Sequence, residues 1–219
     1  MKFHPAGKRT IRNTIFIVIA MNLIGWLFIS VPTFSYLVSF ASAALLFAIL
    51  QFFRYPERNA TPNDKLVIAP ADGKICFISE FEEKEYLKSR CIKISIFMSP
   101  LNVHINWVPV NGKVTFLKHH EGRFHAAFKD KSAEENERTS VAIKMKDGRE
   151  IVANQVAGAM ARRVLNFLKT GQEVNQQMEM GFIRFGSRVD LYLPLDTKIK
   201  VKLGDVVTGS QTIIGELSE

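Results

Sequence analysis

The sequence predicts an N-terminal transmembrane helical hairpin followed by a mainly β domain with few short helices. Two observations support this fold class. Residues 14–53 contain no Asp, Glu, Lys or Arg, and a bilayer core requires roughly 17–25 apolar residues per helix. Beyond residue 65 the apolar residues occur in short runs separated by Gly, Asn and Asp, which is typical of strands and turns. We therefore expect an anchoring hairpin at residues 1–53, a linker at 54–65 and a globular domain at 66–219.

The apolar N-terminal segment consists of two runs, residues 15–31 and 34–53, interrupted at Pro32. The loop at Pro32 is uncharged, whereas basic residues flank the outer ends of both runs. These are Lys8, Arg9, Arg12, Arg54, Arg58 and Lys65. Because positively charged flanks remain on the cytoplasmic side, we expect both termini and the globular domain there. A shallow hairpin that enters the bilayer without crossing it is the alternative, since the first run is at the short end of the required length.

The charge distribution favours a membrane partner. The formal net charge is +8, and the first 13 residues contribute half of it, with four basic residues and no acid. No basic stripe interleaved with aromatic residues follows, so nucleic acid is not an expected partner. Basic residues near an anionic lipid surface gain about 1 kcal/mol each. The two cysteines, Cys76 and Cys91, match no zinc or CxxC spacing, so we interpret both as reduced core residues and expect no metal site.

Within the globular domain the pattern predicts strands that form a barrel- or sandwich-like core. The expected strands are residues 66–68, 74–78, 91–97, 105–110, 114–117, 141–145, 150–156, 198–203 and 212–217. Segments 69–74 and 204–215 resemble the hammerhead turns of lipoyl-like domains. Residues 157–168 are expected to form a short helix, and residues 119–125 a polar loop.

The most unusual feature of the globular domain is the pair Gly186-Ser187, which lies between strand-like runs at 182–185 and 189–193. A glycine inside a strand permits a close approach to the backbone and conformations that other residues avoid. A serine directly after it is able to turn its hydroxyl toward the preceding carbonyl. Taken alone, the pair is most simply explained as a β-bulge or a tight bend.

Four segments of the globular domain give this pair a chemical context. They are Ala69-Pro70-Ala71-Asp72-Gly73, Ser99-Pro100-Leu101-Asn102-Val103-His104, Ala157-Gly158-Ala159-Met160-Ala161-Arg162-Arg163 and Gly181-Phe182-Ile183-Arg184-Phe185-Gly186-Ser187-Arg188. In their order and spacing they resemble the phosphatidylserine decarboxylase proenzymes in their short form, nearly from end to end of the globular domain. The resemblance implies an enzyme that converts phosphatidylserine to phosphatidylethanolamine. Together with the basic flanks of the hairpin, this predicts an enzyme at the cytoplasmic face of the inner membrane.

The resemblance also implies a self-cleaving precursor. The bond between Gly186 and Ser187 breaks, which gives a β subunit of residues 1–186 and an α subunit of residues 187–219. Ser187 becomes the N-terminal pyruvoyl group of the α subunit, and this group is the implied cofactor. The two subunits form a heterodimer, and a higher homo-oligomer is compatible with the sequence.

The chemistry available to a Gly-Ser pair agrees with this implication. The Ser187 hydroxyl attacks the Gly186 carbonyl and converts the amide to an ester, which requires a strained peptide or a bound oxyanion. A base then removes the Ser187 α-proton, the ester leaves by β-elimination, and loss of ammonia leaves the pyruvoyl group. Its ketone forms a Schiff base with the substrate amine and accepts the electrons released with CO2, as pyridoxal phosphate does elsewhere.

Two further residues match functional positions of the family, the acid Asp72 and the histidine His104. His104 is suited to carry protons near neutral pH. The long branch of the family has a second histidine three residues later, where this chain has Trp107. The base for self-cleavage is therefore open: His104 serves both steps, or a histidine of the polar loop takes over. The polar-loop histidines are His119, His120 and His125.

Three arginines are candidates for binding the lipid phosphate, because guanidinium groups contact phosphate oxygens in pairs. They are Arg162, Arg163 and Arg188. The alternative is that these arginines are solvated surface charges.

Two other classes of protein are alternatives to the decarboxylase. A membrane-anchored adaptor with a lipoyl-like domain would explain the hammerhead segments without catalysis, although the lysine of a lipoyl carrier turn is not evident. A serine hydrolase would use Asp72, His104 and Ser187. However, the G-x-S-x-G elbow of such enzymes is missing, and Ser187 is expected inside a strand.

Overall fold

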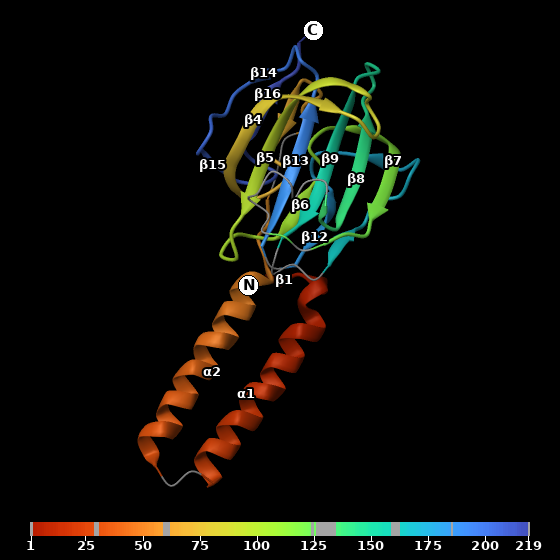
Figure 1. Ribbon diagram of the computed structural model, residues 1–219. Helices are drawn as coiled ribbons and strands as arrows, with labels where there is room; N and C mark the ends of the chain where they lie inside the picture. The colour runs from red at the N-terminus through yellow and green to blue at the C-terminus, as the bar shows by residue number, and fades with distance from the viewer. Residues whose placement is uncertain are drawn as a thin grey trace. The chain divides into compact units, whose positions relative to one another are not determined.

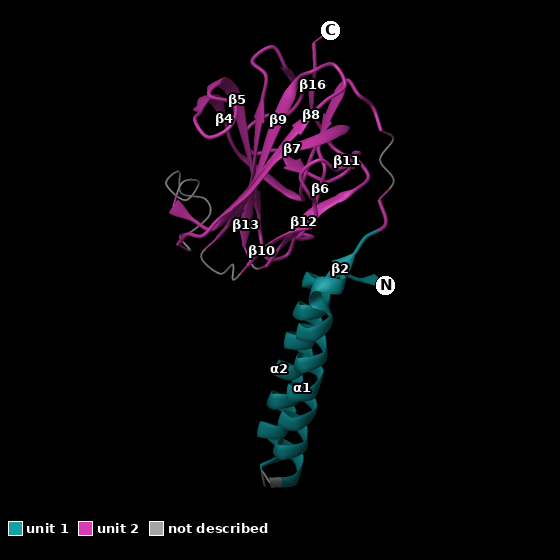
Figure 2. Ribbon diagram, turned by 90° about the vertical axis from the view of Figure 1, so that its right-hand side faces the viewer, with its two compact units in different colours: residues 1–56 teal, residues 57–219 magenta. Residues whose placement is uncertain are grey.

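The computed structural model describes residues 2–28, 31–58, 62–123, 125, 135–158, 163–184 and 186–218. The chain separates into two compact units, Met1–Pro56 and Glu57–Glu219 (Figure 2). The first unit is built from two long helices and the second almost entirely from strands (Figure 1). This confirms the predicted fold class of a helical hairpin followed by a mainly β domain.

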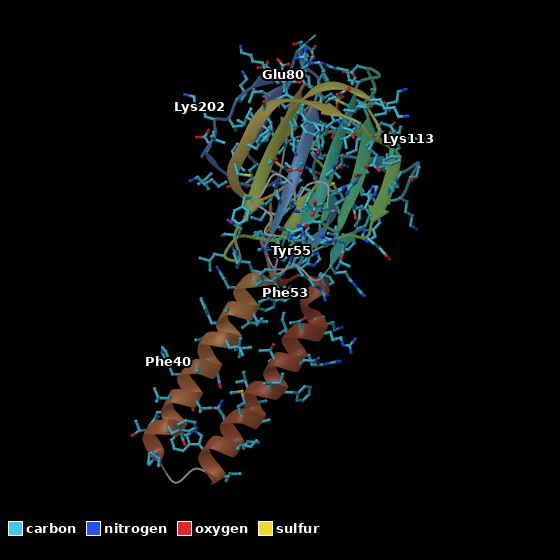
Figure 3. All side chains as sticks on the ribbon, in the orientation of Figure 1. Phe40, Phe53, Tyr55, Glu80, Lys113 and Lys202 are labelled. Carbon is cyan, nitrogen blue, oxygen red and sulfur yellow. The ribbon has the colours of Figure 1, made fainter. Side chains whose placement is uncertain are left out.

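The first unit contains helices α1 (Lys8–Phe28) and α2 (Pro32–Phe52), preceded by the short 3-10 helix η1 (Pro5–Gly7). Proline is favoured at the start of a helix such as α2, because the N–H it lacks would have no partner there. By length and composition both helices are able to cross a bilayer. Most of their apolar side chains are exposed, and Phe40 is 76% exposed (Figure 3). Such apolar surfaces suggest that this unit associates with a membrane.

Contacts at two levels hold the hairpin together. Between the helices, the hydroxyl of Ser39 donates to Oδ1 of Asn22 at 2.6 Å, a hydrogen bond typical of helix pairs in lipid. At the base, strand β1 (Lys2–Phe3) pairs antiparallel with β2 (Arg54–Tyr55) and joins the two outer ends of the hairpin.

In the described residues, the second unit contains three antiparallel sheets. Its strands are β3 (Leu66–Ile68), β4 (Gly73–Glu83), β5 (Ser89–Met98), β6 (Ile105–Trp107), β7 (Gly112–His120), β8 (Arg138–Lys144), β9 (Glu150–Ala157), β10 (Val164–Asn166), β11 (Glu173–Val174), β12 (Glu179–Ile183), β13 (Ser187–Leu193), β14 (Lys198–Ile199), β15 (Val206–Val207) and β16 (Ile213–Glu216). The largest sheet has the order β11-β7-β8-β9-β13-β5-β4-β15 and curls into a half-barrel (Figure 1). The smaller sheets have the orders β10-β12-β6 and β14-β16-β3.

Successive side chains along β13 point alternately to the two faces of the large sheet, as in any strand. Val189 and Leu191 belong to the main hydrophobic core, and Ser187 is in phase with them. Arg188 and Asp190 point to the other face. The candidate nucleophile therefore belongs to the core side of the central strand.

The structure corrects the helix expected at residues 157–168. Within this range Val164–Asn166 forms strand β10, which pairs antiparallel with β12, and residues 159–162 lie outside the described residues. The physical reason is that a short isolated helix is costly to nucleate, whereas an extended segment gains hydrogen bonds at once from an existing strand.

Two smaller expectations are also corrected. His119 and His120 are the last residues of β7 and do not lie in a loop. Cys76 is exposed, whereas Cys91 is buried as expected, and both thiols are free.

Candidate active site

Three strands of the large sheet meet at Ser187. This residue is the first of β13 and lies opposite Met98, the last residue of β5, and Ala157, the last residue of β9. In antiparallel pairs the start of one strand faces the ends of its neighbours. Strand β4 also begins at this end, because its Lys74 pairs with Phe97 of β5. The loops that carry all four sequence motifs therefore leave the sheet at the same end.

Gly186 directly precedes Ser187 and has a φ of +69°. This left-handed conformation is readily adopted by glycine and avoided by most other residues. A Cβ at this position would meet nothing within 4 Å, so the backbone conformation, and not lack of space, favours glycine. The Gly186 carbonyl oxygen accepts a hydrogen bond from the Gly158 N–H at 3.0 Å. This donor is aimed at the atom that becomes negatively charged if Ser187 attacks the carbonyl.

The Ser187 side chain is fully buried. Its hydroxyl donates to Sδ of Met98 at 3.2 Å. A thioether sulfur is a weak acceptor, so this contact orients the hydroxyl without binding it strongly. The candidate nucleophile is thus shielded from water and adjacent to the Gly186 carbonyl.

His104 is also fully buried. Its Nδ1 lies 3.0 Å from the carbonyl oxygen of Asn102. Because a carbonyl can only accept, this contact assigns the proton of the neutral ring to Nδ1 and the lone pair that a base needs to Nε2. The His104 carbonyl accepts the Ile183 N–H at 3.2 Å. The histidine therefore lies beside the strand that leads into Ser187.

The loop before His104 is fixed by its own hydrogen bonds. Oδ1 of Asn102 accepts both the N–H and the hydroxyl of Ser99, at 2.9 and 2.8 Å, and the Asn102 N–H donates to the Ser99 carbonyl at 2.9 Å. This closed turn holds the carbonyl that orients the His104 ring.

Asp72 has a different environment. Its carboxylate forms a bidentate ion pair with Arg58, at 2.5 and 2.7 Å, and accepts the Gly209 N–H at 2.8 Å. The Arg58 guanidinium lies over the ring of Trp107, 4.6 Å from its centroid. Trp107, which replaces the second histidine of the long branch, thus packs on the counter-ion of Asp72. Among the described residues, Asp72 makes its hydrogen bonds with Arg58 and Gly209, so its role in catalysis stays a prediction.

Two of the three polar-loop histidines, His119 and His120, lie toward the far edge of the large sheet. His119 and His120 end β7, which is three strands away from β13. At a usual strand spacing of about 4.8 Å, this separation is about 14 Å along the sheet. The backbone of His125 lies closer, because it bonds the side chain of Asn136, whose Nδ2 donates to the carbonyl of Ala157 at 2.6 Å. The distance argues against His119 and His120 as the base, whereas His104 and His125 stay candidates.

His120 has a local partner of its own. Its Nε2 lies 2.6 Å from a carboxylate oxygen of Glu85. Burial lowers the pKa of His120 most, the positive charge of Arg138 lowers it further, and Glu85 opposes both effects. This histidine is therefore engaged in the contact between β7 and the turn after β4.

Comparison with known proteins identifies the family. The family model of phosphatidylserine decarboxylase matches residues 45–215. The phosphatidylserine decarboxylase proenzymes of Parabacteroides distasonis and Porphyromonas gingivalis are each 44% identical, over 220 and 223 residues, with 100% of both chains covered. The proenzyme of Bacteroides fragilis is 42% identical over 218 residues, covering 99% of this chain and 96% of that protein.

The chain belongs to the phosphatidylserine decarboxylase family. It is therefore an enzyme, as the resemblance of its four motifs implied. Among the residues that the structure describes, no cluster of three or more His, Cys, Asp or Glu is suited to a metal ion.

The arginines predicted to bind the lipid phosphate differ in their surroundings. Arg162 lies outside the described residues. Arg188 is only 3% exposed, and its Nε lies 2.8 Å from Oδ1 of Asp190, on the face opposite Ser187. Arg163 is exposed and lines a cavity of about 690 Å³ with residues of β7, β8 and β10. Glu121 and Glu137 line the same cavity, so it is the exposure of Arg163, and not the charge of the cavity, that makes it more accessible than Arg188 to an anionic headgroup.

Sequence reasoning missed three residues of this region. Gly158 and Met98 lie in or next to quoted motifs, but nothing in the motifs indicates that they contact Gly186 and Ser187. Arg58 was interpreted as a charge flanking the hairpin. Its buried pairing with Asp72 depends on chain folding that no local pattern reveals.

Proposed function

We propose that the chain is a precursor that cuts itself between Gly186 and Ser187 and then decarboxylates phosphatidylserine to phosphatidylethanolamine. The observation that carries this proposal is the Gly158 N–H, 3.0 Å from the Gly186 carbonyl oxygen. Next to that carbonyl is a fully buried serine. The substrate follows from relatives named phosphatidylserine decarboxylase proenzymes.

In the first step, Oγ of Ser187 attacks the carbonyl carbon of Gly186 and gives its proton to a base. Negative charge develops on the Gly186 oxygen, toward which the Gly158 N–H already points. A donor of this kind is worth about 10²–10³ in rate. Breaking the C–N bond then leaves an ester on Oγ and a free amine on Ser187.

Elimination separates the subunits. A base removes the Ser187 α-proton, the Cβ–Oγ bond breaks, and Gly186 leaves as a carboxylate that keeps the former serine oxygen. Addition of water and loss of ammonia then convert the new N-terminus of subunit 187–219 to a pyruvoyl group. We assign the proton transfers to His104, because its Nδ1 contact with Asn102 leaves the lone pair on Nε2.

In turnover, a pyruvoyl group derived from Ser187 would supply a carbonyl for the substrate amine and a sink for the electrons released with CO2. The protein residues supply the surroundings and the protons. Burial at Ser187 keeps bulk solvent away from this residue, and His104 returns a proton to the substrate carbon. A positioned general acid contributes roughly 10²–10⁴-fold. Asp72 remains in the proposal as the acid of the family pattern, with Arg58 as its counter-ion.

Binding of the lipid is proposed to involve the cavity lined by Arg163, where a guanidinium meets the phosphate, with Arg162 as its neighbour in the chain. Helices α1 and α2 would anchor the enzyme on the cytoplasmic face of the inner membrane, as the basic flanks of the hairpin indicate. The two subunits are proposed to remain together as a heterodimer.

The test compares Ser187→Ala with Ser95→Ala, a matched change of a buried serine on β5. We expect intact mass spectrometry to find two subunits for wild type and Ser95→Ala, and one uncut, inactive chain for Ser187→Ala. Activity is measured as labelled phosphatidylethanolamine formed from phosphatidylserine in detergent. An active Ser187→Ala variant would overturn the proposal. An uncut, inactive wild type would favour the adaptor, and labelling of Ser187 by a fluorophosphonate would favour the hydrolase.

A further inference from the structure

A chain of buried polar side chains ends at the Ser187 hydroxyl. Sδ of Met98, which accepts from Ser187, also accepts from Nδ2 of Asn106 at 3.5 Å. Oδ1 of Asn106 accepts from Nε2 of Gln155 at 2.8 Å, and Oε1 of Gln155 accepts from Nδ2 of Asn166 at 2.9 Å. Met98, Asn106 and Gln155 are fully buried. The proposed steps of self-cleavage use none of them.

The hydrogen bonds of this chain run in one direction. Each amide donates toward Ser187 and accepts from the amide behind it, so the orientation of Gln155 fixes that of Asn106. Buried amides are costly unless their hydrogen bonds are made. Apolar side chains would fill the same space at a lower cost in free energy. The two buried amides of Asn106 and Gln155 therefore require a reason other than packing.

The first glycine of the motif around Ser187 makes room for this chain. A Cβ on Gly181 would lie 2.6 Å from Nε2 of Gln155 and 2.1 Å from the carbonyl oxygen of Leu165. Gly181 thus allows the Gln155 amide to lie against the backbone of β12. One motif therefore contains the cleavage site and the space for the side chain that supports it.

We propose that Asn106, held by Gln155, is a positioning residue for self-cleavage. It fixes the Met98 thioether, which in turn holds the Ser187 hydroxyl in the rotamer that reaches the Gly186 carbonyl. Methionine has three rotatable bonds and settles in several conformations unless it is held. The distance and alignment of a nucleophile are decisive, since a displacement of about 1 Å can cost about 10²-fold in rate.

The inference rests on the proposed self-cleavage and makes a distinct prediction. In the elimination step the serine oxygen leaves with Gly186, so residue 187 no longer has a hydroxyl to orient. The positioning role of Met98 and Asn106 therefore ends with maturation. Variants at these positions are expected to mature slowly and then turn over normally, which a general loss of stability would not produce.

The experiment uses the full-length chain and compares Met98→Leu and Asn106→Leu with Met145→Leu, a matched change of a buried methionine in the same core. Leucine conserves the volume of methionine at modest cost to stability. We expect Met98→Leu and Asn106→Leu to form the α subunit at least about tenfold more slowly than wild type, with decarboxylation per pyruvoyl group unchanged. Met145→Leu is expected to match wild type in both measurements.

Three outcomes would overturn the inference. Wild-type cleavage rates for Met98→Leu would do so even if Asn106→Leu fails to fold. Equal losses of cleavage rate and of turnover per pyruvoyl group would indicate a structural role. A wild-type chain that is not cut would refute the proposed function, and this inference with it. If wild type and Met98→Leu are both cut at the same rate, only the inference is refuted.

Discussion

At the residue scale, the proposed cleavage site combines a glycine in the left-handed region with a hydrogen-bond donor from another loop. Gly186 has a φ of +69°, and the Gly158 N–H reaches its carbonyl oxygen at 3.0 Å. Glycine adopts this φ about as readily as a negative one, so this dihedral stores little strain. We infer that stabilisation of the oxyanion contributes more to self-cleavage than strain in the peptide does.

A pair of substitutions at Gly158 tests this inference. Gly158→Pro removes the N–H, while Gly158→Ala keeps it. The preceding residue, Ala157, is already in a strand, as a residue before proline prefers. We expect self-cleavage to slow by about 10²–10³ in the proline variant and much less in the alanine variant, measured as the appearance of the α subunit over time. Equal self-cleavage rates in Gly158→Pro and Gly158→Ala would show that the Gly158 N–H does not determine the rate.

His104 separates maturation from catalysis. Self-cleavage happens once per chain and tolerates a slower step, whereas every turnover needs a proton returned to the substrate carbon. We expect His104→Ala to mature slowly or in part, and its matured fraction to decarboxylate at least about 10²-fold more slowly. The measurement is activity normalised to pyruvoyl content. Normal turnover would show that His104 is structural and would redirect the search to His119, His120 and His125.

At the element scale, the ion pair of Arg58 and Asp72 connects segments that are distant in sequence. Arg58 precedes β3, Asp72 lies in the turn between β3 and β4, and Gly209 lies between β15 and β16. Nearby, the Ser210 N–H donates to the Ala69 carbonyl at 2.8 Å. The two segments that resemble hammerhead turns therefore lie together, with Arg58 closing one side.

Breaking this ion pair separates its structural role from catalysis. Arg58→Met leaves a buried carboxylate without its counter-ion, which typically costs about 3–5 kcal/mol of unfolding free energy. The double variant Arg58→Met/Asp72→Asn removes both charges, and we expect it to regain most of that stability in urea denaturation. If the refolded double variant is cut and decarboxylates like wild type, Asp72 has only a structural role. If it is stable and inactive, the carboxylate is needed for the chemistry.

At the scale of the whole molecule, an apolar helical hairpin precedes a β domain whose proposed substrate is a lipid. Helices α1 and α2 are long and apolar enough to span a bilayer, and the basic residues lie outside their apolar cores. As a membrane anchor, such a hairpin would keep the enzyme at the surface where its proposed substrate resides. The side of the membrane on which the β domain lies can then be tested by experiment.

The positive flanks predict that the N-terminus and the β domain share the cytoplasmic side. With an epitope tag at the C-terminus, protease added to spheroplasts is expected to leave the tag intact, and protease added to inverted vesicles to remove it. A periplasmic protein and a cytoplasmic protein serve as controls for vesicle orientation. Loss of the tag in spheroplasts would contradict this topology.

The sequence alone determined the features that depend on local patterns. The charge-free stretch of residues 14–53 predicted the two helices, alternation predicted most strands, and Gly186-Ser187 with its flanking motifs indicated the family. Tertiary structure decided which groups meet. Ser187 contacts Met98, 89 residues away, and Arg58 contacts Gly209, 151 residues away. Strand pairing likewise turned Val164–Asn166 into β10 in place of a helix. Such contacts depend on sheet order and register, which are set by the burial of the whole core and not by any one segment.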